Sequence, residues 1–328
     1  MTMLFGQTRS GEPVHAVDLG GGRLTARVLT LGAILNDVRL DGRPLTLGAR
    51  DVAAYEGPME TFGSLIGPVV NRIRGARAMI AGRTHHFETN FEGAHTLHSG
   101  ADGTHRQVWR LEESGPAHAL LSLELLDGLG GFPGHRRVRA RYSLAGDALT
   151  LEISAESDAP TLFSFANHSY WALDGEPGFA GHTLTVPAGR YLQNDASLMP
   201  TGRILDVEET EFDARRGVAL AGDSTQFFDL NYCFCEGDRA VYEVARLRGK
   251  TGLEMTMEST APGLQVYDCA TIEAPSVATH HGAGYGRYAG LALEAQRWPG
   301  ALEHPHFSSI AYPAGRRFHQ VTRWTFSR

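Results

Sequence analysis

Residues 149–156 read Leu-Thr-Leu-Glu-Ile-Ser-Ala-Glu, with an apolar side chain at every odd position and a polar one at every even position. Successive side chains of a β-strand point to opposite faces, so this alternation is typical of a strand with one buried face. A second alternating run, residues 138–144, precedes it, and Ala145, Gly146 and Asp147 lie between the two. Such residues favour a turn, so this part of the chain is predicted to form a β-hairpin.

Similar strand-like runs recur along the whole chain. They cover residues 23–40, 78–88, 108–113, 119–126, 181–187, 241–246, 253–258, 264–268, 290–294 and 322–326. Thirty-nine glycines and fifteen prolines separate these runs, and only a short helical turn around Asp51–Tyr55 interrupts the pattern. No linker, composition change or internal repeat divides the chain. We therefore predict an all-β protein with one large antiparallel β-sandwich domain over residues 1–328.

Composition and charge exclude several classes of protein. Of the 328 residues 42% are hydrophobic and 20% charged, as in ordinary globular proteins. The net charge of -7 and the scattered arginines argue against a nucleic-acid partner. Residues 1–15 contain Arg9, Glu12 and Pro13, which do not suit a signal peptide, and no later run approaches eighteen apolar residues. We expect a cytoplasmic protein that does not associate with membranes.

The three cysteines Cys233, Cys235 and Cys269 are too few and too irregularly spaced for a disulfide framework or a zinc site. Cys233 and Cys235 are two residues apart in the run 230–235, so we expect both on one face of a strand. Buried thiols are common in that setting.

Histidine pairs raise the alternative of a bound metal. They occur at His85–His86, His280–His281 and His304–Pro305–His306. A β-sandwich of the cupin kind holds its metal with a His-x-His pair, a carboxylate and a further histidine. No matching Glu and His follow the last pair near the chain end, so we expect these histidines to be exposed to solvent or to lie in loops, and we predict no metal.

Four other segments place titratable or multidentate side chains among residues that fill a strand interior poorly. They are Asn71–Arg72–Ile73, Leu97–His98–Ser99–Gly100, Asn167–His168–Ser169–Tyr170–Trp171 and Glu294–Ala295–Gln296. Each alone has a plain structural explanation, such as a hydrogen-bonded histidine, a turn or the end of a strand. Their combination is more specific.

Further segments complete an ordered set. They are Leu31–Gly32–Ala33, Gly131–Phe132–Pro133–Gly134, Pro200–Thr201–Gly202, Phe212–Asp213 and Pro262–Gly263–Leu264–Gln265–Val266–Tyr267. Together with the four segments above, they make nine. The nine segments resemble the aldose 1-epimerase (galactose mutarotase) family in order and approximate spacing, over nearly the whole chain. The resemblance implies a large twisted β-sandwich whose concave face holds a pyranose. It also implies an isomerase that interconverts the α and β anomers of a free aldose without a cofactor.

The resemblance also implies residue roles. His168 matches the family's general acid and Glu294 its general base. The positions that hold the sugar are matched by Asn71, Arg72, His98, Gln265 and Asp229. At Asp229 the match is partial, because the family usually has histidine next and this chain has Leu230.

The reaction itself explains why an acid and a base are needed together. Opening the sugar ring removes the proton of the C1 hydroxyl while the ring oxygen is protonated, and closing it reverses both transfers. A base works best with a pKa near the working pH, so a glutamate has to be shifted upward, as burial would do, although Arg72 opposes that shift. Arg72 and His98 could stabilise negative charge on a sugar oxygen.

Departures from the family pattern leave the preferred sugar open. They are Pro68–Val69–Val70, Ser99, Trp171–Ala172–Leu173, Ala295 and Gly300–Ala301. For Trp171, Tyr170 and Trp298, stacking on the sugar and packing in the core fit the sequence equally well.

Two alternatives stay open. A hexose-6-phosphate mutarotase would need extra cationic or N–H donors beside the site, and we find no such cluster. A non-catalytic carbohydrate-binding domain would not need a matched acid and base. For the assembly we expect a monomer or a weak homodimer, because nothing marks a sheet edge as adhesive.

Overall fold

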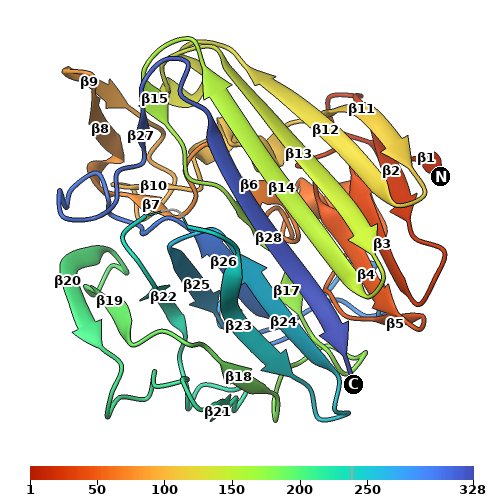
Figure 1. Cartoon of the computed structure of the whole chain (residues 1–328). Helices are drawn as coiled ribbons and strands as arrows, with labels where there is room; N and C mark the ends of the chain where they lie inside the picture. The colour runs from red at the N-terminus through yellow and green to blue at the C-terminus, as the bar shows by residue number, and fades with distance from the viewer. Residues whose placement is uncertain (238) are drawn as a thin grey trace.

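The computed structural model describes residues 1–237 and 239–328, and its largest element is a nine-stranded antiparallel sheet (Figure 1). The strand order is β11 (Arg110–Gly115), β12 (His118–Leu125), β13 (Arg136–Ala145), β14 (Ala148–Ser157), β28 (Phe318–Ser327), β24 (Glu254–Ser259), β23 (Tyr242–Arg248), β18 (Thr183–Thr185) and β21 (Val218–Ala219). The C-terminal strand β28 lies in the middle of this sheet, between β14 and β24.

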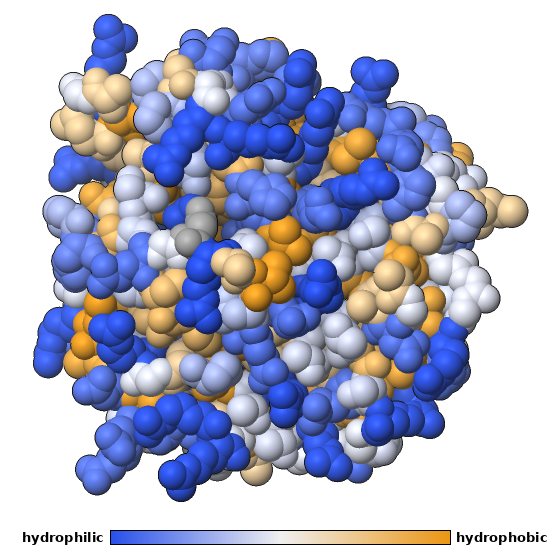
Figure 2. Space-filling view, in the orientation of Figure 1, coloured by the Kyte–Doolittle hydropathy of each residue, from blue (hydrophilic) through white to orange (hydrophobic). Residues whose placement is uncertain are grey.

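The predicted hairpin is confirmed as β13 and β14. Their register runs from Arg136↔Ser157 to Ala145↔Ala148, so Gly146 and Asp147 form a two-residue connection. Gly146 has φ +60°, which the tight turns of such hairpins require and which glycine adopts without strain. The outward face of the sheet is mainly hydrophilic (Figure 2). Arg137, for example, forms an ion pair there with Glu124.

A six-stranded sheet packs behind the nine-stranded one. Its order is β17 (Tyr170–Trp171), β26 (Leu291–Gln296), β25 (Gly263–Tyr267), β22 (Asp229–Cys233), β19 (Arg190–Asn194) and β20 (Pro200–Asp206). Leu264, Leu293 and Leu230 from this sheet share one buried cluster with Leu151 and Trp324 of the nine-stranded sheet. The main hydrophobic core therefore lies between the two sheets, as a sandwich requires.

The rest of the chain forms a smaller sheet and short strand pairs. The five-stranded sheet consists of β1 (Thr2–Gln7), β2 (Pro13–Leu19), β3 (Leu24–Leu29), β4 (Leu35–Leu40) and β5 (Arg43–Pro44). The two-stranded pairs are β6 (Leu65–Ile66) with β16 (Ala166–Asn167), β7 (Arg72–Ile73) with β10 (Thr96–Leu97), β8 (Arg77–Ile80) with β9 (Arg83–His86), and β15 (Thr161–Leu162) with β27 (Ala311–Tyr312). Within the described residues, α-helix is confined to α1 (Val52–Tyr55), the predicted helical turn, where the Asp51 side chain accepts from Ala54 N–H.

The all-β sandwich predicted from the sequence is confirmed, and each predicted run overlaps at least one strand. Among the strands of five or more residues, the sequence missed β1, β2, β19 and β20. In β1 most side chains are exposed, so its sequence carries no alternation between buried and solvent-facing positions. The single-domain organisation stays a prediction.

The expectation for the cysteines was wrong for Cys235. Strand β22 ends at Cys233, and Cys235 lies two residues beyond it, where its thiol contacts the carbonyl oxygen of Gly237 at 2.9 Å. The chain leaves the strand geometry before the two side chains can share a face.

Among the described residues, the structure has no helix with the length and apolar character needed to cross a membrane.

Candidate active site

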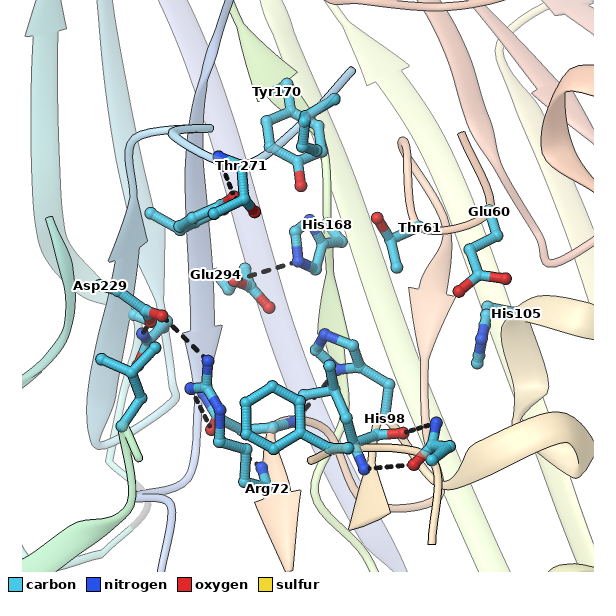
Figure 3. Close-up of a pocket in the computed structure, with 18 of the residues that line it drawn as sticks. Glu60, Thr61, Arg72, His98, His105, His168, Tyr170, Asp229, Thr271 and Glu294 are labelled. Carbon is cyan, nitrogen blue, oxygen red and sulfur yellow. Dashed lines mark hydrogen bonds and ion pairs between the residues drawn. The ribbon is translucent and has the colours of Figure 1, made fainter. Parts of the chain in front are cut away.

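A cavity of about 300 Å³ opens on the face of the six-stranded sheet that points away from the main core. It is lined by all seven residues singled out in the sequence: Asn71, Arg72, His98, His168, Asp229, Gln265 and Glu294. These residues are up to 223 positions apart, from Asn71 to Glu294, and come from separate strands and turns. The polar side chains converge on the middle of the cavity (Figure 3).

Strand β26 explains how Glu294 comes to face the cavity. Leu291, Leu293 and Ala295 belong to the core between the two large sheets, so Glu294, between them in the sequence, points to the opposite face. It is only 2% exposed. On the neighbouring strand β25, Gln265 is its direct cross-strand partner and shares that face.

One wall of the cavity is a buried polar network around Asp229. The Nη2 of Arg72 donates to its Oδ2 at 2.9 Å, and the Nε2 of Gln265 donates to its Oδ1 at 2.6 Å. The side chains of Arg72 and Asp229 are 9% and 8% exposed, so this ion pair is shielded from solvent. Each oxygen of the carboxylate is thus held in a fixed direction, which orients Arg72 and Gln265 toward the cavity. The Arg72 guanidinium also lies 4.9 Å from the centre of the Phe91 ring.

His168 lies in the turn between β16 and β17, and its neighbours hold it there. Its backbone N–H donates to the Ser64 carbonyl at 2.9 Å, and its own carbonyl accepts from Gly63 N–H at 3.0 Å. The Asn167 amide donates to the Gly63 carbonyl, and the Ser169 hydroxyl donates to Asn167. The Asn-His-Ser sequence therefore fixes the turn through its two flanking side chains and leaves the imidazole free to face the cavity.

His168 and Glu294 meet in the centre of the cavity. Nε2 of His168 lies 3.4 Å from Oε1 of Glu294, and both side chains are almost fully buried. Burial raises the pKa of Glu294 to about 8, with Asp229 adding to the shift and Arg72 opposing it. Burial also lowers the pKa of His168 to about 4. Both shifts have the sign expected when a charged form loses its hydration.

His98 faces the pair from the turn after β10, with its ring centre 5.4 Å from that of His168. The Asn71 backbone N–H donates to Nδ1 of His98 at 3.2 Å. Burial lowers the pKa of His98 well below its usual value, so the imidazole is neutral, and because Nδ1 accepts, Nε2 carries the proton. His98 can therefore donate a hydrogen bond to an oxygen in the cavity.

The backbone around His98 is strained. Asn71, His98 and Ser99 have φ values of +68°, +54° and +66°, a region that residues with a Cβ seldom adopt. Ser99 offsets this cost, because its hydroxyl accepts from the Val69 N–H and donates to the Val69 carbonyl, both at 2.9 Å. Such hydrogen bonds hold this turn against relaxation.

The structure shows which of the aromatic residues Trp171, Tyr170 and Trp298 line the cavity and which pack elsewhere. Trp171 is fully buried, with its ring 5.8 Å from Trp324 in the main core, and it does not line the cavity. Trp298 is also outside the cavity, with its indole N–H donating to the Pro262 carbonyl. Tyr170 does line the cavity, and its ring centre lies 5.1 Å from that of His168.

Sequence reasoning missed the wall formed by Glu60, Thr61, His105 and Arg106. Glu60 and Thr61 follow α1 in an irregular segment without periodicity, and no motif marks them. His105 and Arg106 follow the Leu-His-Ser-Gly segment within ten residues, and their closeness to it is the one signal that could have indicated them.

The histidine pairs lie elsewhere. Nε2 of His280 is 3.1 Å from the Asn36 carbonyl, and the corresponding atoms of His304 and His306 contact the carbonyls of Pro200 and Gly202. In residues 1–237 and 239–328, no three histidine, cysteine, aspartate or glutamate side chains are grouped so that they could hold a metal ion.

A twisted β-sandwich of this kind, with a histidine and a glutamate buried together in a polar cavity, has the fold of the galactose mutarotase-like proteins. The sequence profile of one family in that class, aldose 1-epimerase, matches residues 15–325, and the chain belongs to this family. It is therefore an isomerase of the mutarotase type.

Individual relatives agree with this assignment. The chain is 30% identical to galactose mutarotase of Mus musculus, in an alignment that covers 99% of this chain and 97% of the mouse protein. It is 27% identical to aldose 1-epimerase of Escherichia coli, over 98% of this chain and 93% of that protein. The crystal structure of an aldose epimerase homologue from C. elegans superposes with a TM-score of 0.87 at 25% identity, covering 95% of this chain and 98% of the other.

Proposed function

We propose that this chain interconverts the α and β anomers of a free aldose, with Glu294 as general base and His168 as general acid. The observation that carries the proposal is the 3.4 Å approach of these two side chains in a cavity of about 300 Å³. A hemiacetal needs an acid and a base within reach of two oxygens attached to the same carbon, and a buried pair at this separation meets that requirement.

The reaction balances within the pair and the sugar. Glu294 takes the proton of the C1 hydroxyl, the C1–O5 bond breaks, and His168 gives its proton to O5. The product is the open-chain aldehyde. Rotation about C1–C2 presents the other face of the carbonyl, and ring closure returns both protons. No oxidant, leaving group or covalent intermediate enters the reaction, and we propose that no cofactor is needed.

The protonation state of the pair suits a reversible transfer. With pKa values of about 8 for Glu294 and about 4 for His168, the pair holds one proton at neutral pH, on the carboxyl group. The form with an ionised glutamate and a protonated histidine has the same number of protons. The proposed reaction uses this second form, which requires that proton to move across the 3.4 Å gap against the direction of both pKa shifts.

The remaining predicted residues suit a sugar ligand. Arg72 and Gln265 are oriented by Asp229, and His98 offers an Nε2–H donor. We propose that these four and Asn71 bind hydroxyl groups and the ring oxygen, and that Arg72 and His98 stabilise negative charge during ring opening. A monomer or weak homodimer, a cytoplasmic location and a single domain remain our predictions.

Polarimetry of freshly dissolved α-D-glucose, galactose and xylose tests the proposal. We expect relaxation to the anomeric equilibrium to be faster than in buffer alone for at least one of the three, with or without a chelator. Measurable sugar binding without acceleration would instead indicate a non-catalytic carbohydrate-binding domain. Equal rates with glucose and glucose 6-phosphate would favour the hexose-6-phosphate mutarotase alternative.

A further inference from the structure

The cavity extends past His168 to a polar wall that the proposed reaction does not use. This wall consists of Glu60, Thr61 and His105 (Figure 3), and Arg106 also lines the cavity. His105 is 4% exposed, and its Nδ1 has no hydrogen-bond partner among the described residues. Glu60 forms an ion pair with Arg106 at the edge of the cavity. Nδ1 is buried against Gly103, so the nitrogen left to meet a ligand is Nε2, and together with the Glu60 carboxylate on the same wall it indicates a place for a polar group of a ligand.

The local backbone fits the His105 ring closely. A Cβ atom at Gly103 would lie 2.6 Å from Nδ1 of His105 and 2.7 Å from the His98 carbonyl oxygen, so only glycine leaves room for the ring there. Burial, together with Arg106 and His168, lowers the pKa of His105 to about 3. The imidazole is therefore neutral and offers one donor and one acceptor.

The two ends of the cavity lie on opposite sides of the catalytic pair. The charges of Asp229 and Arg72 shift the pKa of Glu294. Its cross-strand partner Gln265 donates a hydrogen bond to Asp229. His168 helps to lower the pKa of His105. The backbone of His168 is hydrogen-bonded to Gly63 and Ser64, which closely follow Thr61 in the sequence. Figure 3 shows the same order, from Asp229 through Glu294 and His168 to Thr61 and Glu60.

This order orients a bound pyranose. In the ring, C1 carries both the hydroxyl that Glu294 would deprotonate and the ring oxygen that His168 would protonate. Beyond the ring oxygen comes C5 with its substituent, and on the other side of C1 comes C2. A sugar aligned with the pair therefore directs C2 toward Asp229 and the substituent of C5 toward Glu60, Thr61 and His105.

We propose that Glu60, Thr61 and His105 form a subsite for the hydroxymethyl group on C5 of an aldohexose, and that they set the preference for hexoses. The inference rests on the proposed function, because the acid and base roles determine the orientation. The Glu60 carboxylate accepts the hydrogen of the 6-hydroxyl, and His105 and Thr61 satisfy its oxygen. A pentose lacks this group, so the polar wall would stay unsatisfied.

The same wall disfavours a phosphate at C6. A phosphate monoester brings a charge of about -1.5 to -2 next to the Glu60 carboxylate, and the nearest cation, Arg106, is already paired with that carboxylate. Free hexoses are thus preferred over both pentoses and hexose 6-phosphates, although Arg106 is present.

The test compares D-glucose with D-xylose, which is glucose without C6 and its hydroxyl, in Glu60→Gln and His105→Leu. We expect the ratio of kcat/KM for glucose over xylose to fall about tenfold or more in each variant, because a hydrogen bond to the 6-hydroxyl is lost. The value for xylose should stay the same or rise, because xylose leaves these side chains unsatisfied in the wild type, and thermal unfolding reports correct folding. In Glu60→Gln, kcat/KM for glucose 6-phosphate should rise, because Arg106 is released.

Glu124→Gln is the matched control. Glu124 is also half-exposed, at 43% against 41% for Glu60, and is also paired with an arginine, but it lies on the outer face of the nine-stranded sheet. It should leave the ratio unchanged. If His105→Leu does not fold, Glu60→Gln, at a partly exposed position, still decides the question.

The outcomes separate the two proposals. Wild-type protein that accelerates neither sugar would contradict the proposed function. An active wild-type protein whose glucose-to-xylose ratio is unchanged in Glu60→Gln would overturn the subsite. A fall in the glucose-to-xylose ratio in Asp229→Asn instead of Glu60→Gln would also overturn the subsite, because C5 would then lie at the opposite end of the cavity.

Discussion

Nε2 of His168 lies 3.4 Å from Oε1 of Glu294, and both side chains are almost fully buried. Because the charged form of either group loses hydration on burial, the pKa of His168 is lowered and that of Glu294 is raised. This relationship leads to predictions for rate, pH dependence and stability.

Replacing either member of the pair should abolish most of the catalysis. In His168→Asn and Glu294→Gln we expect kcat to fall by about 10²–10⁴-fold, the contribution typical of a positioned acid or base, with little change in sugar affinity. Polarimetry gives the rate and calorimetry the affinity. His306→Asn, which changes a histidine bonded to the Gly202 carbonyl, is the control. Near wild-type turnover in Glu294→Gln would exclude it as the base.

The dependence of kcat/KM on pH should be bell-shaped. The pair has to hold one proton; it gains a second below the pKa of His168, about 4, and loses the last above that of Glu294, about 8. Asp229 and Arg72 are the charged groups that act on Glu294. We expect activity to fall on both sides of this range in initial rates corrected for buffer catalysis. An acidic limb at the ordinary histidine value of 6.5 would contradict the burial effect.

Glu294→Gln should become more stable than the wild type as the pH rises. The pKa of Glu294 is raised on folding from 4.5 to about 8, so between these values the native protein binds more protons than the unfolded chain and its stability falls with rising pH. A glutamine at this position does not ionise, so its burial does not cost stability as the pH rises. The difference in Tm should grow from about pH 4.5 to pH 8 and then level off, and an equal difference at pH 5 and pH 9 would argue against it.

Arg72→Ala should damage both stability and binding. It leaves Asp229 buried without its cation, and breaking a buried pair in this way costs about 3–5 kcal/mol of unfolding free energy. KM should rise as well, because Arg72 lines the cavity. In urea unfolding, Arg72→Ala combined with Asp229→Asn should recover part of the loss. A double variant no more stable than Arg72→Ala would mean that the unpaired charge is not the cause.

Trp171→Phe should lower the stability of the protein without changing sugar binding. Trp171 is fully buried against Trp324 and Phe326 and is absent from the cavity wall. We expect a loss of about 0.5–3 kcal/mol in unfolding free energy with an unchanged KM. A large increase in KM for the folded variant would show that this residue acts on the substrate after all.

Local sequence was sufficient for the strands and for part of the site. The alternation in residues 149–156 predicts β14, and the same period of two in β26 directs Glu294 away from the core that receives Leu293. These assignments need only the geometry of one extended strand. Strand β1 could not be found in this way, because both of its faces are largely exposed.

Only the tertiary structure decided which distant residues meet. Arg72 and Asp229 are 157 positions apart, and Glu60 and His105 join the cavity from segments that carry no motif. Pairing between strands and packing of the turns bring these groups together, and burial then sets their charge. The sequence by itself determined the alternating strands and the ordered polar segments. The cavity, its proton arrangement and its second wall depended on long-range contacts and on the exclusion of water, which no local pattern encodes.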